Sequence, residues 1–405
     1  MRRNLILAVL VAVIGGVLSA QQGGAPAGGP QQGAAQGGRG RGAGGGAGRG
    51  AAATPTNPAD TYGTSDTLYT MPEAGQGGGA GDPTAEQLAA SPEAQQIIAN
   101  ARRMAGTDLA AEVNRFCTWN ATANVPPGNS PEMVQMFDNV YYATTGAVGA
   151  LVIKTSDGII LWDTLDSEDE AKTIIEAGMR KFGMDPAQIR YIVIGHHHND
   201  HTGGLEYLQR LYNPTILMGK LDWDVIMTSG KHVRRGLDVR DGQKLTLGDT
   251  TLTLFLLPGH TPTSVSGIIP AKYAGRTFNF LLLTASRFST YASLAPFQRI
   301  FDEGKRAKVE AVFQVHPEIN MLKTETIQAL RQYRGSGPHP LLFTPEKAAR
   351  YMDVELECGK ARIAANKTAL DKARTPEYYR TPDPPAPPAT VTPAAPQRGG
   401  RGNAQ

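Results

Sequence analysis

Residues 191–204 read Tyr-Ile-Val-Ile-Gly-His-His-His-Asn-Asp-His-Thr-Gly-Gly, so four of the chain's eight histidines and one aspartate follow a short apolar run. The run 191–194 is β-branched and aromatic and is bounded by Gly195, which is typical of a buried strand that ends where the polar residues begin. The histidines therefore lie at the mouth of a strand. Imidazole and carboxylate groups gathered in this way predict a metal site rather than a core segment.

The spacing of these residues supports the same interpretation. Alternate side chains of an extended chain point the same way, so His196 and His198 converge while His197 and Asn199 face elsewhere. Asp200 and His201 follow where the chain turns into a helix, and they reach a second position nearby. One segment thus supplies half the ligands of two metal ions.

Two further histidines also follow apolar runs. His260 comes just after the run 251–257, and His316 follows the run 311–315 and precedes Pro317. Both therefore end probable strands, as the histidines of 196–201 do. Imidazole and carboxylate ligands without a thiolate favour zinc, although iron and manganese accept the same ligand types.

The four ligand positions of 196–201 match the His-x-His-x-Asp-His signature of the metallo-β-lactamase superfamily, and Gly259-His260-Thr261-Pro262 and His316-Pro317 resemble its later ligand motifs. The resemblance implies that His196, His198 and His260 hold a first Zn²⁺ and that Asp200, His201 and His316 hold a second. It also implies an α/β (α+β) fold, a four-layer αββα sandwich with the metals at the edge between the sheets.

The segment between the last two ligand motifs distinguishes branches of the superfamily. Many members carry a bridging Asp there, and two lactamase subclasses carry a Cys, whereas this chain reads Leu283-Thr284-Ala285-Ser286. A Ser at this place is the pattern of the third metallo-β-lactamase subclass, and the resemblance extends over residues 110 to 365. It implies substrate contacts from Ser286, with Ser289 and Tyr291 as further candidates. Thr263 and Phe288 depart from the subclass, which usually has Gly and Ser at these positions.

The chemistry expected of such a site is hydrolysis of a small molecule. Zinc lowers the pKa of bound water toward about 7, so the resemblance implies a hydroxide nucleophile between two ions. Asp200 would be both a ligand and the catalytic residue that orients this nucleophile. Three functions are open: opening of a β-lactam or similar cyclic amide, hydrolysis of another ester, lactone or phosphodiester, or a non-catalytic envelope protein that binds through its tails.

Other candidate residues have competing interpretations. His197 either packs behind the ligands or lines the rim of the site, His232 lies in a basic cluster typical of a solvated surface, and His339 lies in a Pro-rich turn. Cys117 and Cys358 are the chain's two cysteines and could pair in an oxidising compartment, but the sequence leaves their distance open.

The ends of the chain differ in composition from its middle. Residues 1–20 carry Arg2 and Arg3, an apolar run 5–18 and a small-residue end, which predicts a secretory signal peptide rather than a membrane span, and hence a periplasmic or secreted protein. The segments 21–53 and 375–405 are rich in Gly, Ala, Gln, Pro and Arg and predict disordered tails. A net charge of +3 gives no argument for nucleic acid as a partner.

Between these ends, 54–108 is interpreted as a partly helical extension, with helical periodicity over 85–104, and 109–374 as the metallo-β-lactamase-like domain. Apolar patterning predicts strands near 139–144, 148–154, 158–163 and 190–195 around a helix at 168–181. A second half follows with strands near 243–246, 249–257, 264–270 and 277–284 and with helices at 296–309 and 345–362. This alternation predicts sheets covered by helices.

Overall fold

The computed structural model describes residues 61–62, 69–70, 83–118, 131–284, 291–316 and 324–365. The predicted signal peptide (1–20), the linker (21–53) and the C-terminal tail (375–405) lie outside these residues, as do Ser286 and Ser289.

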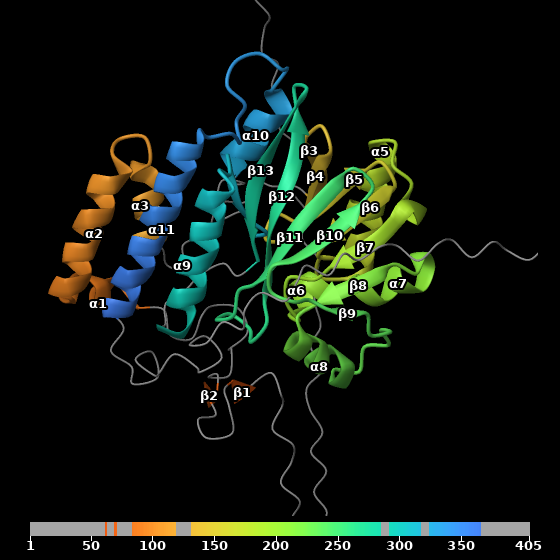
Figure 1. Ribbon diagram of the computed structural model, residues 1–405, viewed down its shortest axis with the longest axis horizontal. Coiled ribbons are helices and arrows are strands. Elements are labelled where there is room, and N and C mark those ends of the chain that lie inside the picture. The colour runs from red at the N-terminus through yellow and green to blue at the C-terminus, as the bar shows by residue number, and fades with distance from the viewer. Residues whose placement is uncertain are drawn as a thin grey trace, which may run out of the picture. The chain divides into compact units, whose positions relative to one another are not determined.

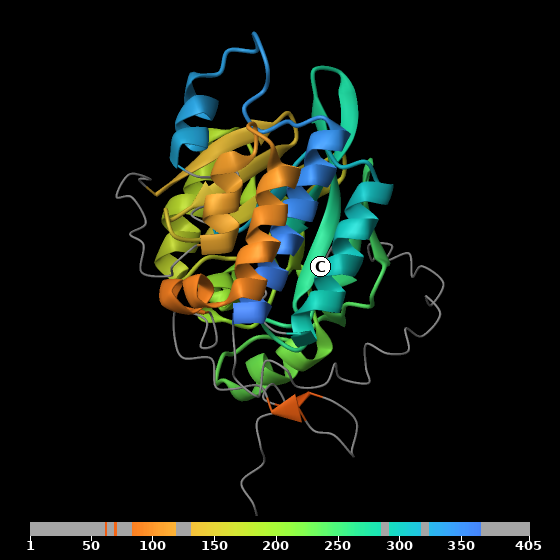
Figure 2. The ribbon, with the colours of Figure 1, turned by 90° about the vertical axis from the view of Figure 1, so that its left-hand side faces the viewer.

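Two β-sheets face each other, and helices cover the outer face of each (Figure 1). Helices α2, α3, α9 and α11 form the outer layer beside the five-stranded sheet, and Figure 2 views the molecule from this side. The segment from α4 to α5 and helices α7 and α8 lie on the side of the seven-stranded sheet. The predicted four-layer αββα sandwich is therefore confirmed.

The larger sheet has the strand order β3-β4-β5-β6-β7-β8-β9 and is antiparallel as far as β6, then parallel. The smaller sheet has the order β10-β11-β12-β13-β14, and its last pair is parallel. The strands are β1 Thr61–Tyr62, β2 Tyr69–Thr70, β3 Glu132–Phe137, β4 Val140–Thr144, β5 Gly149–Thr155, β6 Gly158–Trp162, β7 Ile189–Val193, β8 Thr215–Met218, β9 Leu237–Asp238, β10 Gln243–Leu247, β11 Thr250–Leu256, β12 Val265–Tyr273, β13 Arg276–Leu283 and β14 Val312–Gln314.

The helices include one π-helical and one 3-10 segment. They are α1 Ala85–Ala90, α2 Pro92–Ala105, α3 Ala110–Thr118, α4 Glu168–Glu170, the π-helical η2 Ala171–Glu176, α5 Ala177–Lys181, the 3-10 helix η3 Pro186–Gln188, α6 Asn199–Thr202, α7 Leu205–Tyr212, α8 Lys220–Thr228, α9 Tyr291–Arg306, α10 Thr324–Gln332 and α11 Pro345–Ala365. The helix predicted at 168–181 is thus present as three consecutive segments. Helix α9 begins five residues before the predicted start, because Pro296 lies inside it rather than at its first turn.

Alternate residues of the central strands pack into two different hydrophobic cores. In β6, Ile160 and Trp162 belong to the core between the sheets, whereas Ile159 and Leu161 belong to the core under the helices of the larger sheet. Successive side chains of a strand point to opposite faces, so a strand buried on both faces is apolar throughout. This accounts for the continuous apolar runs that preceded the histidines in the sequence.

The outer helical layer joins segments far apart in the sequence. Helix α11 packs against α2, α3 and α9, and buried residues of α1 and α2 belong to the core between the layers. The pairing that the sequence left open is present: a disulfide connects Cys117 of α3 with Cys358 of α11, and both cysteines are buried. No helix in the described part of the chain has the length and apolar character needed to cross a membrane.

Helix α11 also carries a buried carboxyl group. Glu355 is 4% exposed, and the side-chain amide of Gln314 in β14 donates to its Oε1 at 2.9 Å. Burial, reinforced by the nearby Glu112, raises the pKa of Glu355 to about 8, from an ordinary value of 4.5. The folded protein therefore holds the proton more tightly than the unfolded chain does, so this group contributes a loss of stability as the pH rises from about 4.5 through 8.

We expect Glu355→Gln to remove this pH dependence, because the amide keeps an oxygen acceptor for Gln314 and cannot ionise. The urea midpoint of the variant should be close to that of the wild type at pH 5 and higher than it at pH 9. Glu346→Gln changes an exposed residue of the same helix and is the matched control, with no gain expected at pH 9. If the urea midpoint of Glu355→Gln equalled that of the wild type at both pH 5 and pH 9, the raised pKa of Glu355 would be contradicted.

Candidate metal centre

Three histidines converge at the end of the seven-stranded sheet. His196 and His198 follow β7, and His260 comes from the turn between β11 and β12. Nε2 of His196 lies 3.0 Å from Nδ1 of His198 and 3.1 Å from Nε2 of His260. Four ligands about 2.0–2.1 Å from a tetrahedral zinc ion stand about 3.3 Å apart, so the three nitrogens fit one ion.

The ionisation of these histidines also suits ligands. Burial, together with the neighbouring histidines, lowers the pKa of His198 to about 4 and that of His260 to about 3. The same causes lower the pKa of His196 well below its ordinary value. All three imidazoles are therefore neutral near pH 7 and have a lone pair available for a metal.

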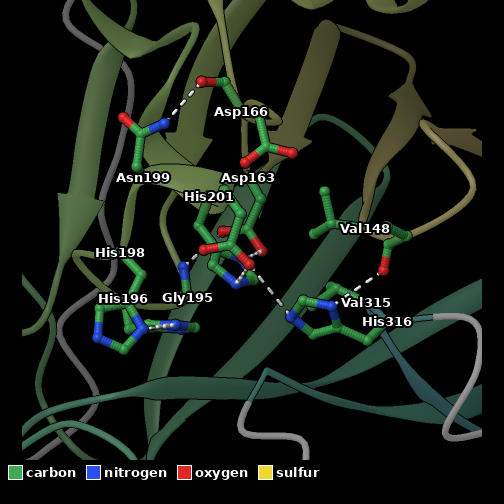
Figure 3. Close-up of polar contacts among 12 residues, drawn as sticks. Val148, Asp163, Asp166, Gly195, His196, His198, Asn199, His201, Val315 and His316 are labelled. Atoms are coloured by element: carbon green, nitrogen blue, oxygen red, sulfur yellow. Dashed lines mark hydrogen bonds and ion pairs between the residues drawn. The ribbon is translucent and has the colours of Figure 1, made fainter. Parts of the chain in front are cut away.

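A second group of ligand atoms adjoins the first. Oδ2 of Asp200 lies 3.3 Å from Nε2 of His201 and 3.4 Å from Nε2 of His316. The ligand atoms of His196, Asp200 and His201 all lie within 4.8 Å of one another, as do those of His196, His198 and His260. In Figure 3, His201 lies between the pair His196 and His198 and the ring of His316. The structure therefore brings together all six predicted ligands.

In the second group, the ring nitrogen of each histidine that points away from Asp200 has a hydrogen-bond partner that fixes the tautomer. Nδ1 of His201 donates to the buried carboxylate of Asp163 at 2.9 Å, and Nδ1 of His316 donates to the carbonyl oxygen of Ala147 at 3.0 Å. Donation from Nδ1 leaves Nε2 of each ring to bind a metal. Nε2 of His201 is buried and forms no hydrogen bond within the described residues, which fits an atom that faces an ion.

The carboxylates of Asp163 and Asp200 favour a positive charge at His201. Although burial acts in the opposite direction, the carboxylates of Asp163 and Asp200 raise the pKa of His201 to about 10. The same cationic ring, together with His316, keeps the pKa of Asp200 below its usual range despite burial. The carboxylates thus stabilise one positive charge at this point, and a divalent metal beside Asp200 supplies it in place of the proton.

Two aspartates of the site, Asp163 and Asp222, were not predicted from the sequence. Asp163 directly follows β6, so it shares with the histidines the signal of a polar residue after a buried strand. Asp222 lies within α8, where an acidic residue in the first turn of a helix is ordinary and gives no such signal. Both side chains are fully buried.

The remaining predicted residues have different positions. Nδ1 of His197 contacts Asp222 at 2.6 Å, so this ring packs behind the ligands. His339 is buried against the ring of Phe137, and the His232 backbone amide donates to Glu206. Tyr291 begins α9, but its side chain is not described, and Ser286 and Ser289 lie outside the described residues.

Comparison with known proteins gives a family match for the part of the chain that carries five of the six candidate ligands. Residues 143–272 match the family model described as the metallo-beta-lactamase superfamily. The N-acyl homoserine lactonase AttM of Agrobacterium fabrum is 28% identical over 126 residues, which make up 27% of this chain and 45% of AttM. The chain thus spans less than half the length of this curated relative.

Solved metallo-beta-lactamases are also similar to the chain. Rm3 metallo-beta-lactamase aligns with a TM-score of 0.51 at 19% identity, covering 60% of this chain and 96% of Rm3, which shows the fold. BJP-1, a subclass B3 metallo-beta-lactamase of Bradyrhizobium japonicum, aligns at 25% identity with a TM-score of 0.46, covering 55% of this chain and 90% of BJP-1. For residues 143–272, the family match confirms the superfamily predicted from the histidine motif.

We expect Asp163→Asn to weaken metal binding by about 10- to 100-fold. The Asp163 carboxylate accepts from both the Gly195 amide, at 2.7 Å, and the His201 ring. An amide that keeps the first bond turns its NH₂ toward Nδ1 of His201 and forces the ring proton onto Nε2, the ligand atom. Zinc affinity measured by chelator competition tests this, and an unchanged affinity in a folded variant would refute it.

Proposed function

We propose that this protein, whose residues 143–272 belong to the metallo-β-lactamase superfamily, is a dinuclear zinc hydrolase that opens a β-lactam or a similar cyclic amide. The observation that carries the proposal is the pair of adjoining ligand sets, one of three neutral histidines and one that contains Asp200. A site with three histidines suits a zinc ion with one open position.

The residues of the chain divide the work at this site. Zinc ions, when bound, supply Lewis acidity and lower the pKa of water to about 7. His196, His198 and His260 would hold the ion that faces the substrate carbonyl. Asp200 remains ionised at neutral pH. Its carboxylate would accept a hydrogen bond from the attacking water and orient it. The hydrogen bonds to Asp163 and Ala147 hold the rings of His201 and His316 so that Nε2 of each ring can bind a metal.

A second candidate is the hydrolysis of a lactone or another ester. It is supported by the sequence likeness to AttM, which is named as an N-acyl homoserine lactonase. The departure at Phe288 from the lactamase pattern also favours it. A non-catalytic envelope binding protein is the weakest alternative, since such a protein has no need of two complete ligand sets.

We also propose that the protein is exported to the periplasm or beyond. Two observations support this: the basic and apolar pattern of residues 1–20, and the buried disulfide between Cys117 and Cys358, a bond typical of oxidising compartments. In that location, a β-lactam hydrolase would meet its substrate before the antibiotic reached its target, and the host would become resistant.

Hydrolysis of a carbapenem should be lost in the presence of a metal chelator and restored by added zinc. The loss is expected because no side chain among the described ligands can replace the ion as an electrophile. The assay should include an N-acyl lactone and a phosphodiester, each at matched concentration. Zinc-dependent turnover of the lactone without turnover of the carbapenem would replace the first candidate with the second, and turnover that survives metal removal would overturn both.

Asp200→Ala should lower zinc per chain from about two toward one, because it removes a ligand of the second group while the three histidines of the first group remain. Turnover should fall with it, by more than the 10- to 100-fold that is typical for a residue behind the ligands. Asp169→Ala, at an exposed position of α4, is the matched control and should change neither quantity. Zinc per chain after gel filtration and initial rates give the two readouts. Full activity in Asp200→Ala would remove the role given to this carboxylate.

A further inference from the structure

A buried carboxylate joins the two segments that carry the predicted first-site ligands. Asp222 in α8 is 0% exposed and accepts five hydrogen bonds. Its Oδ1 accepts from the backbone amide and the ring of His197, at 3.0 and 2.6 Å. Its Oδ2 accepts from the Thr261 hydroxyl at 3.1 Å and from the Thr263 amide and hydroxyl at 3.1 and 2.6 Å.

The donors to the two oxygens belong to different ligand segments. His197 lies between His196 and His198 in the chain, whereas Thr261 and Thr263 follow His260. The two oxygens of a carboxylate are a fixed distance apart, so binding both sets of donors fixes one segment relative to the other. The three nitrogens that must meet on one ion therefore take their spacing partly from Asp222.

Only an ionised carboxylate satisfies this arrangement. A backbone N–H, which can only donate, faces each oxygen: that of His197 faces Oδ1 and that of Thr263 faces Oδ2. An asparagine amide, whichever way it is placed, would turn its own NH₂ toward one of these N–H groups and leave that N–H without an acceptor. Although burial acts against ionisation, the hydrogen bonds from His197 and Thr263 lower the pKa of Asp222, so it is charged at neutral pH.

The departure at Thr263 belongs to this network. The Asp222 backbone amide donates to the Thr263 hydroxyl at 3.1 Å, so the residue binds both ends of Asp222. The backbone of Thr263 also lies close to Gly219: a Cβ at that glycine would stand 2.0 Å from the Thr263 carbonyl oxygen. A hydroxyl at position 263 therefore has a structural task here that a glycine cannot perform.

We propose that Asp222 is the positioning residue of the first metal site, and that it acts through His197 on His196 and His198 and through Thr263 on the turn that carries His260. This inference rests on the proposed zinc site. The ring of His197 also stands nearly perpendicular to that of His198, with centroids 4.8 Å apart, so the hydrogen bond to Asp222 fixes a ring that supports a ligand.

The experiment compares the full-length wild type with Asp222→Asn, Thr263→Val, Thr263→Ser and the control Asp224→Asn. Asp224 lies on the same helix, but its carboxylate pairs with Lys220 and Arg235 at the surface. Zinc affinity is measured by chelator competition, and the visible spectrum of the Co²⁺-loaded protein reports ligand geometry. Amide hydrogen exchange of the metal-free protein is followed over 195–202 and 258–265.

Asp222→Asn should lower zinc affinity by about 10- to 100-fold, change the Co²⁺ spectrum and speed exchange in both segments. Thr263→Val should speed exchange only in 258–265 and lower affinity less, whereas Thr263→Ser should restore wild-type behaviour because it keeps the hydroxyl. Asp224→Asn should match the wild type. If Asp222→Asn does not fold, Thr263→Val and its serine counterpart decide the question.

Unchanged exchange in both segments of a folded Asp222→Asn variant would overturn the anchoring role, and faster exchange with unchanged zinc affinity would overturn its importance for the metal. Failure of the proposed function looks different. A wild type that binds zinc but hydrolyses no substrate leaves the positioning result intact. A wild type that binds no zinc overturns the metal part of the inference, while exchange still decides whether Asp222 joins the two segments.

Discussion

The site depends on the close approach of the two sheets at Gly195. Its amide donates to Asp163 after β6, and its carbonyl accepts from Val265 of β12 at 2.7 Å, so this residue bonds to both sheets. A Cβ here would stand 1.7 Å from a methyl carbon of Thr284, and Thr284 in turn donates to the Val265 carbonyl. Because no side chain fits at Gly195, the ends of β7, β12 and β13 lie in direct contact. The histidines that follow β7 therefore face those of the opposite sheet. A larger residue would separate the two halves of the ligand set.

Electrostatics then divides the site into two unequal halves. The group of His196, His198 and His260 has no carboxylate among its members, so burial and mutual repulsion keep these rings neutral. The group of His201 and His316 shares Asp200, and Asp163 stands behind it, so positive charge is stabilised there. A divalent ion in the first group is attracted by lone pairs alone, whereas one in the second also neutralises an ionised carboxylate. In the proposed hydrolase, this difference would suit an ion in the first group to polarising a substrate carbonyl and an ion in the second group to orienting a nucleophile.

All six candidate ligands could be found in the sequence because they follow strands, and buried strands have a visible pattern. Apolar runs of the kind found in β6, β7 and β11 indicate where a strand ends, and the family motif supplied the partition of ligands between two ions. Strand β3, in which the exposed Gln135 interrupts the buried residues, and the short β8 were not predicted. Brief apolar segments do not distinguish a strand from other buried chain. Asp222 was missed for a related reason. Its importance comes from donors 25 and 39 to 41 residues away, and no local pattern records such a partnership.

The network around Asp222 also shows why a departure from a family pattern is hard to interpret one residue at a time. Read alone, Thr263 in place of glycine suggests a change at the substrate pocket. In the structure its hydroxyl is buried and bonded to a carboxylate on a neighbouring helix, and its backbone occupies the space that Gly219 leaves. Thr263, Gly219, Asp222 and His197 therefore form one structural unit, in which each residue is explained by the others. Position 263 consequently says more about how this chain holds His260 than about which substrate it takes.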